Sequence, residues 1–200
     1  MNKMTPAIIK ESSRGFDRVE IEDEMFMDRK IFLTKPVDAS SMDGFIRQLL
    51  YLNQSDPSKK ITVYINSPGG EVGSGLAAYD LMHLIEAPVT TICIGEAASM
   101  AAILFLAGSE RIMFPNSRIM IHDPSPAGGS LQGMKPDEVE EKLKDLQKMR
   151  DKLCSIIAEK TDKTMEEIRA KTCKDSYFSA QEALAFGLAT KIAERIGNDE

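Results

Sequence analysis

The sequence predicts an α/β fold in which helices cover a mixed or parallel sheet. Two kinds of segment alternate along the chain: short runs rich in β-branched and aromatic residues, and longer runs with apolar residues at helical spacing. The first unit is a predicted strand at 30–34, a helix at 41–54 and a strand at 61–66. This order is typical of a βαβ unit, which implies parallel strands and a helix packed on the sheet.

The same alternation continues through the middle of the chain. Residues 89–95 have the composition of a strand that is buried on both faces. We expect residues 96–98 to form a small-residue turn into the next helix. The other elements predicted in this part are a turn at 67–70, helices at 75–87 and 100–108, and short strands at 111–114 and 118–122.

A long amphipathic helix is predicted from Asp137 to about Lys160. Its apolar residues recur at steps of three and four; they are Val139, Leu143, Leu146, Met149, Leu153 and Ile156. The helix would span roughly 36 Å at ~1.5 Å per residue, which is more than a small sheet needs for cover. Its apolar seam could therefore pack on the protein's own core or on another subunit.

Two short helices with capping boxes are predicted after the long helix, at 165–171 and 180–186. In each box a hydroxyl at the N-cap and a carboxylate three residues later satisfy free backbone N–H groups. The paired residues are Thr164 with Glu167 and Ser179 with Glu182. Gly187 is expected to end the second helix.

The composition restricts the domain organisation and the function. Two hundred residues with 42% hydrophobic content suit a single domain over 1–200. A net charge of −6, with basic residues interspersed among acidic ones, argues against a nucleic-acid partner. Three widely spaced cysteines favour a reducing compartment, and no segment has the apolar length of a membrane span. We therefore expect a cytoplasmic protein without a membrane partner.

Ser99 is the first candidate for a catalytic residue. It lies within "GEAASMAAIL", after a predicted strand and where a helix begins. A strand-to-helix turn can hold a nucleophile out of the core, and the first N–H groups of the helix can face a developing oxyanion. Serine is also a preferred N-cap residue, and a serine at a helix start more often has only that role.

A serine nucleophile needs a general base, and the chain has two histidines. His83 lies within a predicted helix, where we expect a packed or half-buried position. His122 ends a predicted strand and precedes a loop rich in proline and glycine, a position typical of catalytic groups in sheet proteins. The third member, an acid, stays open among 31 carboxylates. Asp123 is expected to point away from the imidazole because side chains alternate along a strand.

The segment "INSPGGEVGSG" at 65–75 is the second candidate for a functional site. Pro68 fixes φ, while Gly69 and Gly70 allow conformations in which backbone N–H groups face a ligand. A phosphate site is not expected, because no lysine follows at P-loop spacing. Alone the segment is a tight turn into a helix; beside Ser99 it could supply a second oxyanion donor.

Several motifs in order resemble the proteolytic subunit of the Clp protease, the ClpP serine peptidase family. They are "YINSPGG" at 64–70, "TICIGEAASMAAILFLAG" at 91–108, "PNSRIMIHDP" at 115–124 and "YFSAQEALAFGLATKI" at 177–192. The similarity spans nearly the whole chain. It implies a serine endopeptidase that belongs to an ATP-dependent protease and hydrolyses peptide bonds of unfolded polypeptides.

The resemblance also implies a role for individual residues. By their positions in the family motifs, Ser99 would be the nucleophile, His122 the general base and Asp175 the acid that orients the imidazole. The backbone N–H groups of Gly70 and Met100 would form the oxyanion hole. No cofactor or metal is implied for this chain, because ATP would be used by a partner ATPase.

The fold implied by the resemblance is the ClpP/crotonase type. It has a head of βαβ units, an N-terminal entrance segment at 1–28 and a handle region at about 130–162 that contains the long helix. Members of the family stack two heptameric rings into a tetradecamer around a chamber, with their handle helices interdigitated. An AAA+ Clp ATPase would dock outside, at an apolar pocket that includes Tyr64, and a second ClpP paralogue could join the rings.

Some positions depart from the family pattern. Asp123 stands where glutamine is usual, "PSPAGG" at 124–129 replaces "PLGG", and Cys173 and Lys174 replace a common Asp-Arg pair. Residues 14–29 are also more acidic than the usual entrance segment. An inactive or weakly active structural paralogue in a mixed complex is therefore the alternative. The presence of all three implied triad residues favours activity and speaks against a crotonase-type acyl-CoA enzyme.

Overall fold

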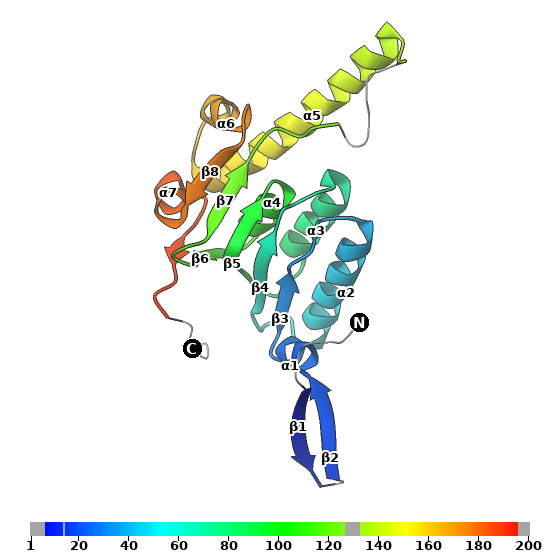
Figure 1. Ribbon diagram of the computed structural model, residues 1–200, viewed down its shortest axis with the longest axis vertical. Helices are drawn as coiled ribbons and strands as arrows, with labels where there is room; N and C mark the ends of the chain where they lie inside the picture. Colours follow the sequence, from blue (N-terminus) through cyan, green and yellow to red (C-terminus); the bar gives the residue numbers. More distant parts are fainter. Residues whose placement is uncertain (1–6, 14, 127–132, 196–200) are drawn as a thin grey trace.

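The computed structural model describes residues 7–13, 15–126 and 133–195. These residues form the expected α/β architecture, with a sheet, a projecting long helix and an N-terminal hairpin (Figure 1). The strands are β1 (Ala7–Ser12), β2 (Gly15–Glu20), β3 (Lys30–Leu33), β4 (Ile61–Ser67), β5 (Val89–Ala98), β6 (Glu110–Met113), β7 (Arg118–Ile121), β8 (Ser176–Ser179) and β9 (Lys191–Ile192). The helices are α1 (Ile21–Met27), α2 (Ala39–Ser55), α3 (Val72–Leu84), α4 (Met100–Leu106), α5 (Pro136–Thr161), α6 (Met165–Thr172) and α7 (Ala180–Phe186).

The main sheet branches at β5. The strands β3, β4, β5, β6 and β9 follow one another in space and are parallel. The first half of β5 pairs with β6, whereas its last residues, Glu96–Ala98, pair in parallel with Arg118–Met120 of β7. β8 then adds to the other side of β7 as an antiparallel strand. The carboxyl end of β5 is thus surrounded by strands that come from distant parts of the chain.

The prediction of a turn at 96–98 is wrong, because these residues extend β5. Pairing with β7 supplies backbone hydrogen bonds that the local sequence does not reveal. The β4–β5 register shifts between Ile65 and Ser67, and the Asn66 side chain bridges the irregularity by accepting a hydrogen bond from the Glu96 N–H at 3.1 Å. Gly95 leaves room for this side chain, since a Cβ there would lie 2.6 Å from Asn66 Oδ1. The chain turns only after Ala98.

Helices α2, α3 and α4 pack side by side on the sheet (Figure 1). All residues of α4 are buried, which places this helix at the centre of the core. The predicted helix at 75–87 is shifted in the structure: α3 begins at Val72 and ends at Leu84. It ends at Leu84, where Ile85 turns to an extended conformation, three residues before the position that Pro88 restricts.

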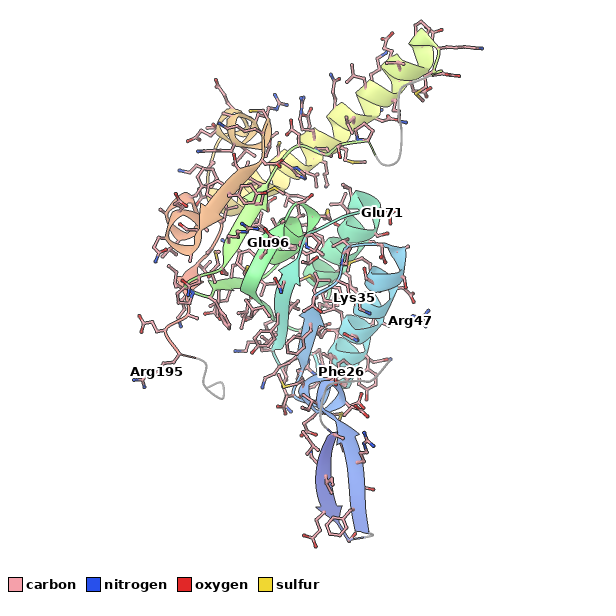
Figure 2. All side chains as sticks on the ribbon, in the orientation of Figure 1. Phe26, Lys35, Arg47, Glu71, Glu96 and Arg195 are labelled. Atoms are coloured by element: carbon pink, nitrogen blue, oxygen red, sulfur yellow. The ribbon has the colours of Figure 1, made fainter. Side chains whose placement is uncertain are left out.

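The predicted long helix is present as α5, and its two halves have different surroundings. Its buried residues all lie toward its C-terminal end; they are Leu153, Cys154, Ile156, Ile157 and Thr161. Toward the other end, Leu143 is 51% exposed, and Met149, at the middle of the helix, is 37% exposed. Figure 2 shows side chains standing out on all sides of this projecting half. The seam therefore packs on the protein's own core at one end and is uncovered in the single chain at the other. Residues 130–132 of the expected handle region lie outside the described residues.

The N-terminal segment is folded where the structure describes it. β1 and β2 form an antiparallel hairpin, and α1 follows directly. Arg29, at φ +61°, ties this segment to the end of α2, because its guanidinium donates hydrogen bonds to several backbone carbonyls. The acceptors are the carbonyls of Leu52, Asp56, Lys59 and Lys60. Neither the hairpin nor α1 is predicted from the sequence, and residues 1–6 of the expected entrance segment lie outside the described part.

The C-terminal region confirms both capping boxes. Thr164 and Ser179 accept hydrogen bonds from the backbone N–H groups of Glu167 and Glu182, respectively. Gly187 ends α7 at φ +93°. β8 and β9 are missed by the sequence analysis, because strands this short depend on their pairing with β7 and β6. In the described part of the chain, no helix has the length and apolar composition needed to cross a membrane.

Truncation of Leu104 tests the central position of α4. The side chain is fully buried, so we expect Leu104→Ala to lower the free energy of unfolding by about 2–5 kcal/mol through lost contacts and a cavity. Leu104→Met keeps most of the volume and should cost less than about 1.5 kcal/mol. Urea unfolding at one fixed protein concentration measures both variants. Equal effects would contradict a tightly packed α4.

Candidate active site

Ser99 forms the whole connection between β5 and α4. Its backbone has φ +54° and ψ −122°, a conformation that costs of order 1–3 kcal/mol for a residue with a side chain. Two backbone contacts hold this turn: the Ser99 N–H donates to the Met120 carbonyl at 2.8 Å, and the Ser99 carbonyl accepts from the Ala102 N–H at 3.0 Å. Ser99 is the N-cap residue of α4, but its side chain makes no capping hydrogen bond. The hydroxyl is thus free to serve another partner.

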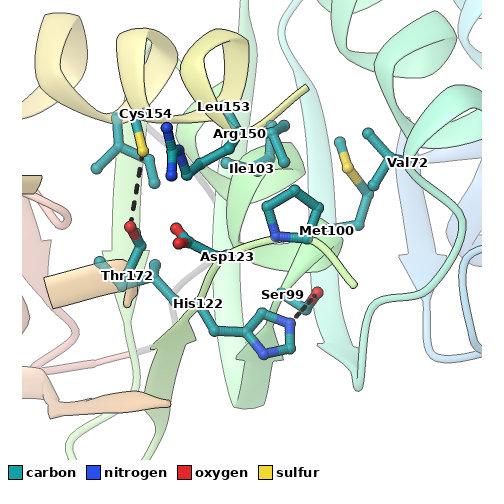
Figure 3. A pocket seen from close by; sticks show the side chains of 13 residues that line it. Val72, Ser99, Met100, Ile103, His122, Asp123, Arg150, Leu153, Cys154 and Thr172 are labelled. Atoms are coloured by element: carbon teal, nitrogen blue, oxygen red, sulfur yellow. Dashed lines mark hydrogen bonds between the residues drawn. The ribbon is translucent and has the colours of Figure 1, made fainter. Parts of the chain in front are cut away.

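That partner is His122. Because β5 and β7 are parallel and Ala98 is paired with Met120, the residues that follow both strands emerge at the same edge of the sheet. The His122 Nε2 lies 2.8 Å from the Ser99 Oγ. Figure 3 shows the imidazole turned toward the hydroxyl across this edge.

Asp175 reaches the same histidine from the other side of β7. It directly precedes β8, whose antiparallel register pairs Ser176 with Ile121 and so places Asp175 beside His122. The His122 Nδ1 lies 2.9 Å from the Asp175 Oδ1. An ionised carboxylate can only accept, so Nδ1 carries the hydrogen, and in the neutral imidazole Nε2 is then the acceptor for the Ser99 hydroxyl. The structure therefore joins Ser99, His122 and Asp175 in one hydrogen-bonded chain.

The glycine-rich turn after β4 lies against the Ser99 turn. A Cβ on Gly69 would come within 2.8 Å of the Met100 nitrogen and 2.9 Å of the Ser99 Cβ, so only glycine allows this approach. Ser67 holds the turn by donating from its hydroxyl to the Lys35 carbonyl at 2.6 Å. Gly69 is buried, while Gly70, at φ +149°, is exposed.

The two amide groups expected to bind an oxyanion differ from their neighbours in their hydrogen bonds. Val37 bridges the glycine turn through the Gly69 carbonyl at 2.8 Å and the Glu71 N–H at 2.7 Å. The bridge does not use the Gly70 N–H, which has no backbone acceptor among the described residues. The Met100 N–H is the first of α4, and such groups have no acceptor within their own helix. Neither N–H group therefore has a backbone acceptor among the described residues.

A largely apolar pocket adjoins Ser99 and His122 (Figure 3). The base of α5 forms one wall, which fixes the helix relative to the site. The apolar lining includes Val72, Met100, Ile103, Ile121, Leu153 and Ile157. The polar lining residues other than Ser99 and His122 are Asp123, Arg150, Thr172 and, with a thiol, Cys154. The lining has the apolar character that would suit a side chain held next to the Ser99 hydroxyl, but the cavity itself, at about 20 Å³, is small.

Charged groups are concentrated on the α5 side of the pocket. Burial raises the pKa of the Cys154 thiol, and the nearby Asp123 charge adds to this effect. The thiol lies 3.6 Å from the Thr172 Oγ1.

No group of three His, Cys, Asp or Glu side chains in the described ranges is placed to hold a metal ion.

The remaining candidates, His83 and Asp123, are not part of the hydrogen-bonded chain of Ser99, His122 and Asp175. His83 is exposed rather than half-buried; its ring contacts Tyr79 in α3, with ring centroids 4.4 Å apart and the ring planes tilted by 37°. Asp123 points away from the imidazole and into the wall of the pocket. Neither the pocket nor the presence of Arg150 in its lining is predicted from the sequence. The one available signal was the charge of Asp123 next to His122.

Comparison with protein families identifies the class of protein. The model of the Clp protease family matches residues 13–196. This match covers most of the chain, so the chain belongs to the Clp protease family. Membership indicates a peptidase of the serine type, and the parallel sheet with its helices agrees with the fold of this family. Clp proteases in general assemble into oligomers that work with ATPases.

Substitution of Gly69 tests the close approach of the two turns. We expect Gly69→Ala to displace the Ser99 turn and to slow the reaction of Ser99 with a serine-directed fluorophosphonate by at least about tenfold, since small misplacements of reacting groups are costly. Gly73→Ala is the matched control, because a Cβ on Gly73 meets nothing within 4 Å. Equal labelling rates for the two variants would contradict the role of the contact.

Proposed function

We propose that the protein is a serine endopeptidase, the proteolytic subunit of an ATP-dependent Clp-type protease. The observation that carries the proposal is the hydrogen-bonded chain from the Ser99 hydroxyl through His122 to Asp175, with distances of 2.8 and 2.9 Å. This arrangement provides a nucleophile, a base and a group that orients the base. The apolar lining of the pocket beside Ser99 suits a substrate side chain that enters when a lining side chain moves.

The chemistry follows from the positions of these groups. Ser99 Oγ attacks the scissile carbonyl while His122 Nε2 accepts its proton, and Asp175 stabilises the imidazolium that forms. The negative oxygen of the tetrahedral intermediate is bound by the N–H groups of Gly70 and Met100. His122 then gives the proton to the leaving amine, and an acyl-enzyme remains. Water, activated by the same histidine, hydrolyses the acyl-enzyme and restores the Ser99 hydroxyl.

The proposed assembly consists of two stacked heptameric rings that enclose the active sites. Its support is the projecting half of α5, whose apolar residues Leu143 and Met149 are exposed in the single chain. Burial of these side chains between opposed rings would stabilise the stack. The cytoplasmic location expected from the sequence belongs to the same proposal.

An AAA+ Clp ATPase is the proposed partner that delivers unfolded polypeptide. The aromatic pair on β3 and β4 supports a docking site there: Phe32 is 44% exposed and stacks on Tyr64, with ring centroids 5.0 Å apart. Hydrolysis of a fluorogenic peptide by the purified chain alone distinguishes an active subunit from an inactive one. If the chain alone is inactive, the same assay with a second ClpP paralogue added tests whether that paralogue joins the rings.

Removal of the nucleophile tests the proposed chemistry. We expect Ser99→Ala to abolish fluorophosphonate labelling and to lower the rate of peptide hydrolysis by at least about ten-thousand-fold, because the acyl-enzyme can no longer form. The control is Ser58→Ala, whose hydroxyl binds Asp56 in an exposed loop. Undiminished labelling of Ser99→Ala would contradict the assignment.

Polar substitution of the exposed seam tests the proposed assembly. In sedimentation velocity we expect the unaltered chain to form double rings, and Leu143→Gln combined with Met149→Gln to shift them to species of half the mass. The control combines Lys144→Gln with Lys148→Gln on the same half of α5, where both lysines are exposed. A monomer of 22.1 kDa for the unaltered chain at micromolar concentration would contradict the assembly.

A further inference from the structure

Asp123 gives the pocket beside Ser99 a carboxylate with one buried oxygen. Its Oδ1 is shielded from solvent and has no hydrogen-bond partner among the described residues. Most of the side chains around it are apolar, and Figure 3 shows the carboxylate inside the ring of lining residues, close to the base of α5. A buried acceptor without a donor is unusual, because it has lost its water without gaining a new partner.

Arg150 is a cation that lines the same pocket, but its hydrogen bond goes elsewhere. Its Nε donates to Asp151 at 3.3 Å, and Asp151 also binds the Arg169 guanidinium at 2.9 Å. No ion pair joins Arg150 to Asp123 within the described chain. The Arg150 side chain is 34% exposed at the edge of the pocket. The Asp123 Oδ1 thus remains without a donor among the described residues, although Arg150 lines the same pocket.

We propose that Asp123 makes this pocket select a substrate side chain that has an apolar stem and ends in a cationic hydrogen-bond donor, lysine foremost. The proposal rests on the proposed peptidase function and concerns P1, the residue whose carbonyl Ser99 attacks. Ser99 and Asp123 line the same pocket, so a side chain that starts at the scissile bond runs from one toward the other. The methylene stem of a lysine packs on the apolar wall, and its ammonium group reaches the carboxylate.

The size of the pocket sets a condition for this binding. The cavity has a volume of about 20 Å³, which is roughly the room that one water molecule needs. A lysine side chain therefore enters only when a lining side chain moves. Arg150 is suited to move because it is partly exposed and its partner Asp151 lies outside the pocket lining. Its outward movement would remove a positive charge from the pocket and leave Asp123 to the incoming ammonium group.

A pair of fluorogenic peptides that differ only at P1 tests the proposal. One carries lysine and the other norleucine, which has the same four-carbon stem without the ammonium group. We expect kcat/KM of the unaltered protein to favour lysine by about tenfold or more, as for a hydrogen bond between charged groups. In Asp123→Asn, which keeps the size and removes the charge, the lysine-to-norleucine ratio should fall at least about tenfold. The ratio is insensitive to general effects on the triad or the assembly.

The controls separate this proposal from the peptidase function. Asp43→Asn removes an exposed carboxylate that pairs with Arg47 on α2, and it should leave the ratio unchanged. A preference of the unaltered protein for norleucine, or a ratio that Asp123→Asn does not change, would overturn the role of Asp123 while the peptidase stands. The first of these results needs no variant and so does not depend on the folding of Asp123→Asn. Absence of Ser99-dependent cleavage of both peptides would overturn both proposals.

Discussion

The parallel pairing of the end of β5 with β7 is the interaction on which the candidate site depends. It places Ser99 and His122 at the same edge of the sheet, although 22 residues separate them in the sequence. The antiparallel addition of β8 brings Asp175 to the same point. Backbone hydrogen bonds between strands therefore set the positions of the three side chains. From these positions the side chains meet at 2.8 Å between Ser99 and His122 and 2.9 Å between His122 and Asp175.

The Ser99 hydroxyl does not cap α4, because it is hydrogen-bonded to His122 at the same edge of the sheet. The Ser99 backbone has a positive φ, and its carbonyl rather than its hydroxyl accepts hydrogen bonds from the N–H groups of Ala102 and Ile103 in the first turn of the helix. The buried helix α4 and the glycine turn hold the backbone in this costly conformation. The α5 helix closes the adjoining pocket and, through its projecting half, links the site to the surface proposed for assembly.

Much of the fold could be predicted from the sequence, because local patterns determine it. The helical spacing in α5 and the capping boxes at Thr164 and Ser179 are examples. The extension of β5 through Ala98 and the short strand β8 could not be predicted, since both depend on pairing with β7. The composition alone left the acid open, and only the family motifs pointed to Asp175. The unpaired oxygen of Asp123 required the tertiary structure, because its surroundings come from α5, α6 and β7.

The most direct test of the account is a reaction that needs both Ser99 and His122. A peptide chloromethyl ketone is attacked at its carbonyl by a serine nucleophile and then alkylates the neighbouring base. Peptide mapping by mass spectrometry should find the adduct on His122, absent from Ser99→Ala, and should leave His83 unmodified. Equal modification of His83 and His122, or modification of His122 that persists in Ser99→Ala, would contradict a functional pairing of Ser99 with His122.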